Sequence, residues 1–143
     1  MSKILNQPPS RHLARVGALV LTCLMLAACQ SIIAVDVVHT TLSPPDSPEN
    51  PILTLEQAQS ITLDTGYERT LPRGSHWKLV GTIVEGRVYK PVDADFTIQG
   101  KDPVSAYLVI SNGQLVGFFV PIEEGFSPLY KRVSISFAKP GKT

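Results

Sequence analysis

The chain has 143 residues, with 13 basic and 12 acidic side chains and a formal net charge of +1. This length suffices for one domain of ordinary size and excludes two, unless part of the chain lies outside any domain. A nearly neutral chain lacks the basic surface with which a protein neutralises phosphates, so the charge balance argues against a nucleic-acid-binding function.

The first 28 residues are typical of an export signal. Lys3, Arg11 and Arg15 are their only charged side chains, and a largely apolar stretch of 13 residues, 16–28, follows. That stretch is too short for a bilayer-spanning helix, which takes about 20 residues. Removal of the signal leaves ten basic and 12 acidic residues from Cys29 onward, a formal net charge of −2.

The signal ends in the tetrapeptide Leu26-Ala27-Ala28-Cys29. An aliphatic residue, two small residues and a cysteine at this place resemble the lipobox of bacterial lipoproteins. The resemblance implies that the Cys29 thiol receives a diacylglyceryl group, that the signal is cut before Cys29, and that the new amino group is acylated. Three acyl chains supply on the order of 35 kcal/mol of membrane affinity, so Cys29 is the predicted lipidation site and membrane anchor. The alternative is an ordinary secretory signal, which fits less well because it requires a small residue at the position of Leu26.

Residues around the predicted cleavage site indicate in which membrane the protein resides and whether the mature domain has a thiol. Gln30 follows the cysteine, whereas Gram-negative lipoproteins that are retained in the inner membrane often carry aspartate there. We therefore expect the periplasmic face of the outer membrane rather than the inner membrane. Cys23 leaves with the signal and Cys29 carries lipid, so the mature domain has no thiol for a disulfide, a nucleophile or a metal ligand. We expect no cofactor beyond the covalent lipid on Cys29.

A tether is predicted between the lipid anchor and the domain. Residues 31–42 are rich in isoleucine and valine and are more β-like than an ordinary linker, which allows an edge strand. Residues 44–51 contain four prolines and predict a stiff, solvated polyproline II spacer. The predicted tether therefore covers residues 29–51, and residues 52–143 are expected to form a small β domain.

One short helix is predicted at the start of that domain. Thr54 and Gln57 fit a capping box, and residues 55–60 would then form two helical turns. Leu55 and Ala58 would be the buried face, which is too small to stabilise the helix without a sheet beneath it.

Beyond the predicted helix, apolar residues recur with the period of two that is typical of β-strands. Strands are predicted over residues 76–83, 87–90, 96–99 and 133–137. With the hairpin described next, the count is six or seven short strands. The predicted fold class is mainly β: an antiparallel meander, either a small barrel or a strongly coiled sheet, with one short N-terminal helix.

The strongest local signal is the pair Asn112 and Gly113, because a type I′ turn needs a positive φ at both central positions. Both flanking strands are apolar on both faces, so this hairpin is expected in the middle of the sheet or covered on both sides. The predicted register pairs Ser111 with Gln114, Ile110 with Leu115, Val109 with Val116, Leu108 with Gly117, and Tyr107 with Phe118.

Candidate catalytic residues are few, and each has a simpler explanation. Ser75 and His76 are adjacent, and on a strand their side chains would point to opposite faces. Asp93 and Asp95 would share one face and could bind a cation or a sugar, although water-facing residues at a strand entry are the favoured interpretation. Neither histidine of the mature domain has a histidine or cysteine at ligand spacing, so we predict no metal site and no enzymatic activity.

Residues 121–132 are predicted to form a long loop between two strands. A hairpin connection needs only two to five residues, and long loops with aromatic anchors often bind partners. In the alternative interpretation Phe126 and Leu129 fold back to cap an open barrel end. The candidate partner-binding residues are Phe126, Leu129, Tyr130, Lys131 and Arg132.

The sequence therefore predicts a lipoprotein that is anchored in the membrane through Cys29 and faces the periplasm. Its expected role is that of a non-enzymatic binding, structural or assembly subunit that contacts another protein of the cell envelope. The alternative is an inhibitor or modulator of a cell-wall hydrolase such as lysozyme, although no inhibitory motif stands out.

Overall fold

A computed structural model describes residues 36–98 and 102–139. The predicted signal, the tetrapeptide that resembles a lipobox and the lipidation site Cys29 lie outside these residues. Within the described ranges, no helix combines the length and hydropathy needed to span a bilayer.

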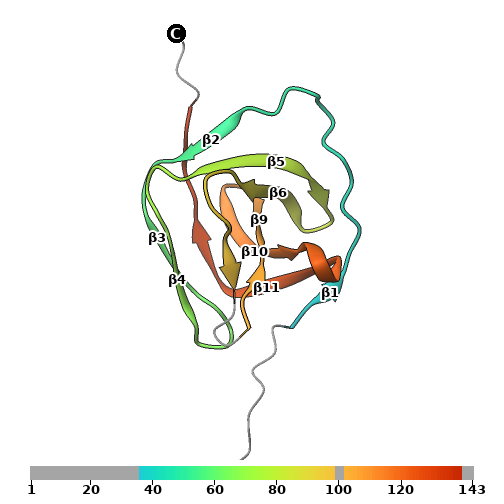
Figure 1. Cartoon of the computed structure of the whole chain (residues 1–143), viewed down its shortest axis with the longest axis vertical. Helices are drawn as coiled ribbons and strands as arrows, with labels where there is room; N and C mark the ends of the chain where they lie inside the picture. The colour runs from blue at the N-terminus through green and yellow to red at the C-terminus, as the bar shows by residue number, and fades with distance from the viewer. Residues whose placement is uncertain (1–35, 99–101, 140–143) are drawn as a thin grey trace, which may run out of the picture. The chain divides into compact units, whose positions relative to one another are not determined.

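The described chain is mainly antiparallel β, as predicted, and its strands outnumber the predicted six or seven (Figure 1). Eight strands form one sheet, and two further pairs form separate hairpins. In spatial order, the sheet consists of β1 (Val38–His39), β11 (Gly125–Ser134), β10 (Gln114–Val120), β9 (Tyr107–Ser111), β6 (Gly86–Pro91), β5 (His76–Ile83), β2 (Ile52–Leu55) and β12 (Phe137–Ala138). The hairpins are β3 (Gln59–Thr62) with β4 (Glu68–Leu71), and β7 (Thr97–Ile98) with β8 (Val104–Ser105).

The sheet is open and does not form the closed barrel that was one of the two predicted forms. β1 and β12 are its edge strands and do not pair with each other. Both edges are only two residues long, which limits the row of unpaired backbone groups that could recruit another strand. The position of β1 agrees with the expectation that residues 31–42 contain an edge strand.

The predicted helix over residues 55–60 is wrong. Leu55 ends strand β2, a bend follows, and Gln59 begins strand β3. In this extended conformation the Leu55 amide donates to the Ser75 carbonyl and the Glu56 amide donates to the Ser136 carbonyl, each over 2.9 Å. Leu55 and Ile61 are both buried in the core in this conformation, and a two-turn helix is too short to be stable by itself.

The proline-rich segment lies against the sheet. Ser43 and Thr82 form an isolated antiparallel bridge with two backbone hydrogen bonds of 2.8 and 2.9 Å. Beyond it, the segment from Pro45 to Pro51 and the strands β5 and β6 enclose a hollow of about 330 Å³. The stretch predicted as a spacer is therefore held to the domain at its start.

The β9–β10 hairpin occupies the middle of the sheet, as predicted. Its turn residues Asn112 and Gly113 have φ values of 50° and 72°, as a type I′ turn requires. Side chains of β10 are buried on both faces, and the adjacent Phe118 and Phe119 belong to two different hydrophobic clusters. The larger cluster includes Trp77 and Leu108, so the core is built on this central hairpin.

The predicted register of the hairpin is correct next to the turn and wrong beyond it. Gln114 faces Ser111 and Leu115 faces Ile110, but then Gly117 faces Val109, because a β-bulge inserts one residue between Leu115 and Gly117. Strand β5 contains the same tripeptide, Leu79-Val80-Gly81, and the same kind of register shift. A glycine within a strand is a recognised signal for a bulge, and the predicted register assumed an unbroken pleat through Gly117.

Gly113→Val is expected to lower the free energy of unfolding by about 1–3 kcal/mol. A β-branched residue at a φ of +72° is strained even though no atom lies within 4 Å of the added Cβ. Chemical denaturation of both proteins measures the difference. An unchanged midpoint would contradict the assignment of the turn to residues 112 and 113.

Candidate functional site

The segment predicted as a partner-binding loop is mostly a strand. Residues Pro121–Glu123 form a short 3₁₀ helix, η2, Glu124 has a φ of 47°, and Gly125 begins strand β11. β11 pairs with β10 on one side and, through Gly125 and Phe126, with β1 on the other. The interior Pro128 breaks the sequence pattern of a strand, but β1 no longer pairs with β11 at that position, so its missing N–H leaves no ladder bond unmade.

The five candidate partner-binding residues do not lie together on the surface. Phe126 and Leu129 are buried, each in a different hydrophobic cluster, whereas Tyr130, Lys131 and Arg132 are exposed. In the alternative interpretation Phe126 and Leu129 fold back to cap a barrel end; both are buried, but as members of strand β11 in an open sheet. Only the three exposed residues remain available to a partner.

A register shift between β10 and β11 explains why three consecutive side chains of this segment face solvent. Gly117 of β10 faces Pro128, and Leu115 faces Val133, so the four residues 129–132 of β11 lie opposite the single residue Val116. The additional residues cannot all follow the pleat. Leu129 turns into the core, and the next three side chains point to solvent.

The exposed part of β11 borders a hollow of about 490 Å³. Its other wall is the turn of the β3–β4 hairpin, with Leu63 and Asp64. The Tyr130 amide donates a hydrogen bond of 2.9 Å to Asp64 Oδ1, which fastens the hairpin turn to β11. The Tyr130 side chain is 94% exposed, so it stands at the edge of this hollow without packing into the core.

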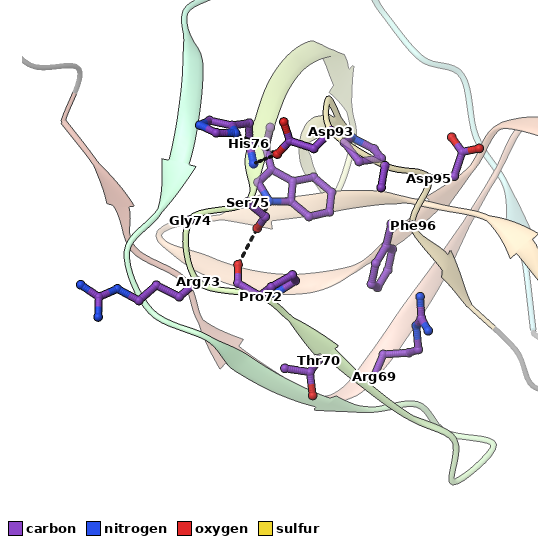
Figure 2. A pocket seen from close by; sticks show the side chains of 13 residues that line it. Arg69, Thr70, Pro72, Arg73, Gly74, Ser75, His76, Asp93, Asp95 and Phe96 are labelled. Atoms are coloured by element: carbon purple, nitrogen blue, oxygen red, sulfur yellow. Dashed lines mark hydrogen bonds and ion pairs between the residues drawn. The ribbon is translucent and has the colours of Figure 1, made fainter.

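A different hollow of about 380 Å³ brings together polar residues that are separate candidates in the sequence (Figure 2). The β4–β5 turn contributes Ser75, and β5 begins with His76. The segment after β6 contributes Asp93 and Asp95, and β4 contributes Arg69. Residues from two separate segments of the chain, 69–77 and 91–96, therefore line one cavity.

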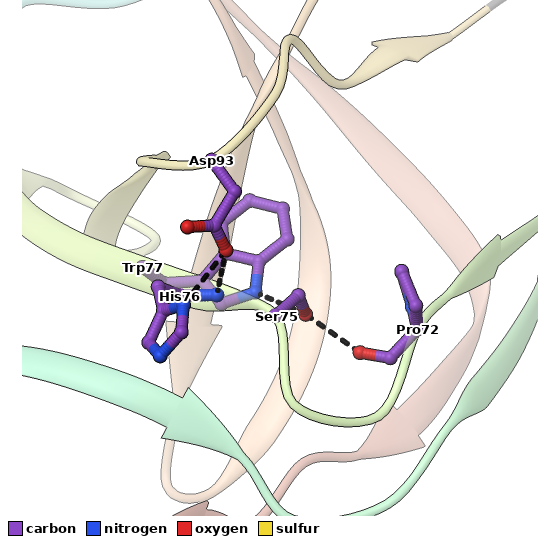
Figure 3. Close-up of polar contacts among 5 residues, drawn as sticks. All are labelled: Pro72, Ser75, His76, Trp77 and Asp93. Atoms are coloured by element: carbon purple, nitrogen blue, oxygen red, sulfur yellow. Dashed lines mark hydrogen bonds and ion pairs between the residues drawn. The ribbon is translucent and has the colours of Figure 1, made fainter.

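His76 and Asp93 form the principal polar contact of this hollow (Figure 3). His76 Nδ1 lies 2.8 Å from Asp93 Oδ2, and the His76 amide donates to the same oxygen over 3.0 Å. The side-chain hydrogen bond, followed by the backbone one, holds the pKa of the Asp93 carboxyl below its ordinary value of 3.8. Because an ionised carboxylate only accepts hydrogen bonds, His76 Nδ1 is the donor in this contact. In the neutral ring Nε2 is then an acceptor.

Ser75 has no part in this pair, as the alternation of side chains along a strand predicted. Its hydroxyl donates to the Pro72 carbonyl over 2.7 Å and accepts from Trp77 Nε1 over 2.9 Å (Figure 3). These contacts hold the β4–β5 turn against the buried Trp77 ring. Ser75 therefore stabilises the β4–β5 turn, whereas the His76 ring is oriented by the Asp93 carboxylate.

The predicted hairpin register does not by itself give the His76–Asp93 contact. The sequence predicts a turn at Glu85 and Gly86, and simple counting from that turn puts His76 opposite Asp95. The observed turn lies one residue earlier, because Ile83 faces Gly86. The bulge in β5 shifts the pairing, and the His76 carbonyl accepts from the Val92 amide over 3.0 Å. The immediate neighbours of the two residues do not reveal the contact, because it depends on the pairing of the whole hairpin.

Asp93 and Asp95 do not gather the ligands of a cation site. Both contacts with His76 go to Oδ2 of Asp93, and no group of three or more histidine, aspartate or glutamate side chains that could hold a metal ion occurs in residues 36–98 and 102–139. An exposed carboxylate pair alone does not meet the coordination needs of calcium.

Asp93→Asn is expected to remove a pH-dependent part of the stability. Because the folded-state pKa of Asp93 is lowered, its carboxylate stabilises the fold fully above pH 3.8, and this contribution is lost as the pH falls through the folded-state pKa. Urea unfolding of both proteins at about pH 6 and about pH 2 measures the effect. The variant should unfold at lower urea at the higher pH, and the two midpoints should converge at the lower. A gap that stays constant with pH would contradict this account.

Comparison of the chain with protein-family models, with curated proteins and with solved structures finds no match.

Proposed function

We propose that this protein is a lipid-anchored, periplasm-facing lipoprotein of the outer membrane and acts as a non-enzymatic binding or assembly subunit of an envelope complex. The anchor in this proposal is Cys29, whose sequence context resembles a lipobox. The partner-binding surface is the exposed part of β11, Tyr130, Lys131 and Arg132, with the β3–β4 turn beside it.

The observation that carries the binding surface is the exposure of Tyr130. A tyrosine that is 94% exposed contributes almost nothing to the core, and it borders a hollow large enough to receive a partner's side chains. Tyrosine and arginine are among the residues most enriched at the positions that dominate binding energy in protein interfaces. Here both occur within three residues of one strand, on a backbone fixed by the Asp64 hydrogen bond.

The proposed anchor would keep this surface close to the membrane. Strand β1 starts at Val38, nine residues after Cys29. Nine fully extended residues span at most about 32 Å. The tether would therefore keep the start of β1 within that distance of the lipid surface, and a partner of the proposed subunit would be an envelope protein near the membrane.

Site-specific photocrosslinking in intact cells tests the binding surface. A p-benzoylphenylalanine at position 130 should capture one envelope protein, and the same group at position 84 should not, since Val84 is equally exposed but lies in the β5–β6 turn. Lys131→Glu should reduce capture at position 130. A captured cell-wall hydrolase would support the alternative role of an inhibitor. Equal capture at both positions would contradict the proposed surface.

Intact mass spectrometry tests the anchor. The mature wild-type protein should begin at Cys29 and carry acyl mass, and Cys29→Ala should accumulate as the unprocessed precursor, because the lipid-dependent peptidase lacks its modified substrate. A processed wild-type protein without added acyl mass would end the lipoprotein proposal.

A further inference from the structure

Beyond this proposed function, we infer that the hollow between the β4–β5 turn and the segment before β7 binds a small zwitterion of amino-acid size, with its carboxylate toward Arg69 and its ammonium group toward Asp95 and Asp93. Three features of the hollow support this ligand: the charges that line it, the contacts of Arg69, and the hydrogen bonds that hold Asp93.

Both signs of charge line the same cavity. Arg69 approaches it from β4, and Asp93 and Asp95 approach it from the segment after β6. A purely anionic ligand would meet two carboxylates, and a purely cationic one would meet a guanidinium group. A zwitterion satisfies both poles, and the volume of about 380 Å³ lies in the range of small-molecule sites.

Arg69 is held in a way that a purely structural arginine would avoid. Its guanidinium carbon lies 5.2 Å from the centroid of the Phe96 ring, which fixes the direction of the side chain. Its Nε is buried and donates to no acceptor among the described residues. The His76–Asp93 pair is the one ion pair in the described ranges, so no carboxylate of those residues neutralises Arg69. An unmet buried donor on a charged group costs stability and calls for an explanation, which an anionic group bound beside Arg69 would supply.

The opposite side of the hollow carries the two carboxylates, Asp93 and Asp95, that would face the ammonium group of the ligand. His76 holds Asp93 by two hydrogen bonds to one carboxylate oxygen, so its other oxygen remains free of those contacts. Asp95 is exposed, and in Figure 2 it stands on the same side of the hollow as Asp93, beyond the Phe96 ring from Arg69. Asp93, held in this way, can accept a hydrogen bond from an ammonium group with little rearrangement, and Asp95 adds a second negative charge beside it.

Tryptophan fluorescence can report ligand binding in this hollow. Trp77 is the single tryptophan of the chain, lines the cavity and donates to Ser75 in the turn above it. A ligand that enters should change the tryptophan fluorescence of the full-length protein in detergent solution.

Titration with alanine, propionate and alaninamide tests the zwitterion directly, because propionate lacks the ammonium group and alaninamide lacks the carboxylate. Alanine should give a saturable change in Trp77 fluorescence, and each of the other two should bind at least tenfold more weakly. Equal binding of propionate would make this an anion site and overturn the inference. Phosphoethanolamine binding more tightly than alanine would overturn the assignment of a carboxylate.

Two variants and a control separate binding from folding. Arg69→Gln should weaken alanine binding at least tenfold, and Asp95→Asn, whose side chain is exposed, should weaken it about fivefold without affecting the fold. Arg87→Gln is the matched control, since Arg87 lies on β6 outside this hollow and should leave the affinity unchanged. No saturable signal with alanine, or an unchanged affinity in both Arg69→Gln and Asp95→Asn, would overturn the inference. None of these outcomes bears on the β11 surface or on Cys29.

Discussion

Phe126→Ala is expected to lower the free energy of unfolding by about 3–5 kcal/mol, whereas Tyr130→Ala, four residues along the same strand, should change it by less than about 0.5 kcal/mol. Phe126 is 7% exposed and belongs to a hydrophobic cluster with Val109 and Phe119. Its removal leaves a cavity that the paired strands on either side of β11 cannot close. Tyr130 leaves no cavity, because its ring lies in solvent.

Chemical denaturation of the two variants measures this difference, and crosslinking to the partner provides the second readout. Tyr130→Ala should reduce partner capture while the fold stays intact. A Tyr130→Ala protein that loses several kcal/mol would show that this ring packs into the domain. Such a result would remove the observation on which the proposed binding surface depends.

Gly117→Ala is expected to cost about 3 kcal/mol of stability, although the change adds a single methyl group. The added Cβ would lie 2.5 and 2.6 Å from Cε2 and Cζ of the Phe126 ring, and closer still to the Ser127 carbonyl oxygen. That oxygen belongs to the backbone of β11, so the two strands must separate. Phe126 cannot move aside because its own cluster encloses it.

Gly113→Ala is the matched control for this substitution. It adds the same methyl group at the other end of β10, where no atom lies within 4 Å, so its cost is limited to backbone strain. Denaturation midpoints of both variants measure the two losses of stability, and Gly117→Ala should show the larger one. An equal loss in the two would contradict the close approach of β10 and β11 at Gly117.

Gly117→Ala should also disturb the proposed binding surface. Gly117 faces Pro128, directly before the bulged residues 129–132 that turn Tyr130 outward. Separation of the strands at this point would disturb the pairing of β10 with β11 that positions residues 129–132. Partner capture at position 130 should then fall together with stability, whereas in Gly113→Ala it should not.

Features that depend on neighbouring residues in the chain could be predicted from the sequence. The turn at Asn112 and Gly113 was predictable because few residue pairs accept two positive φ values, and that requirement is local. The antiparallel β class followed from the period of two, and the central place of the β9–β10 hairpin followed from its two apolar faces.

The features that could not be predicted are those in which a strand far along the chain supplies the stabilising contact. Residues 55–60 are extended because Ser75 and Ser136 offer hydrogen bonds that a local helix cannot match. Register shifts in three strand pairs changed the predicted pairing, and the one between β10 and β11 leaves residues 130–132 exposed in succession. His76 and Asp93 meet across 17 positions because the β5–β6 hairpin brings its open ends together. In each case the free energy comes from hydrogen bonds and burial between segments far apart in the chain, and patterns among near neighbours do not contain that information.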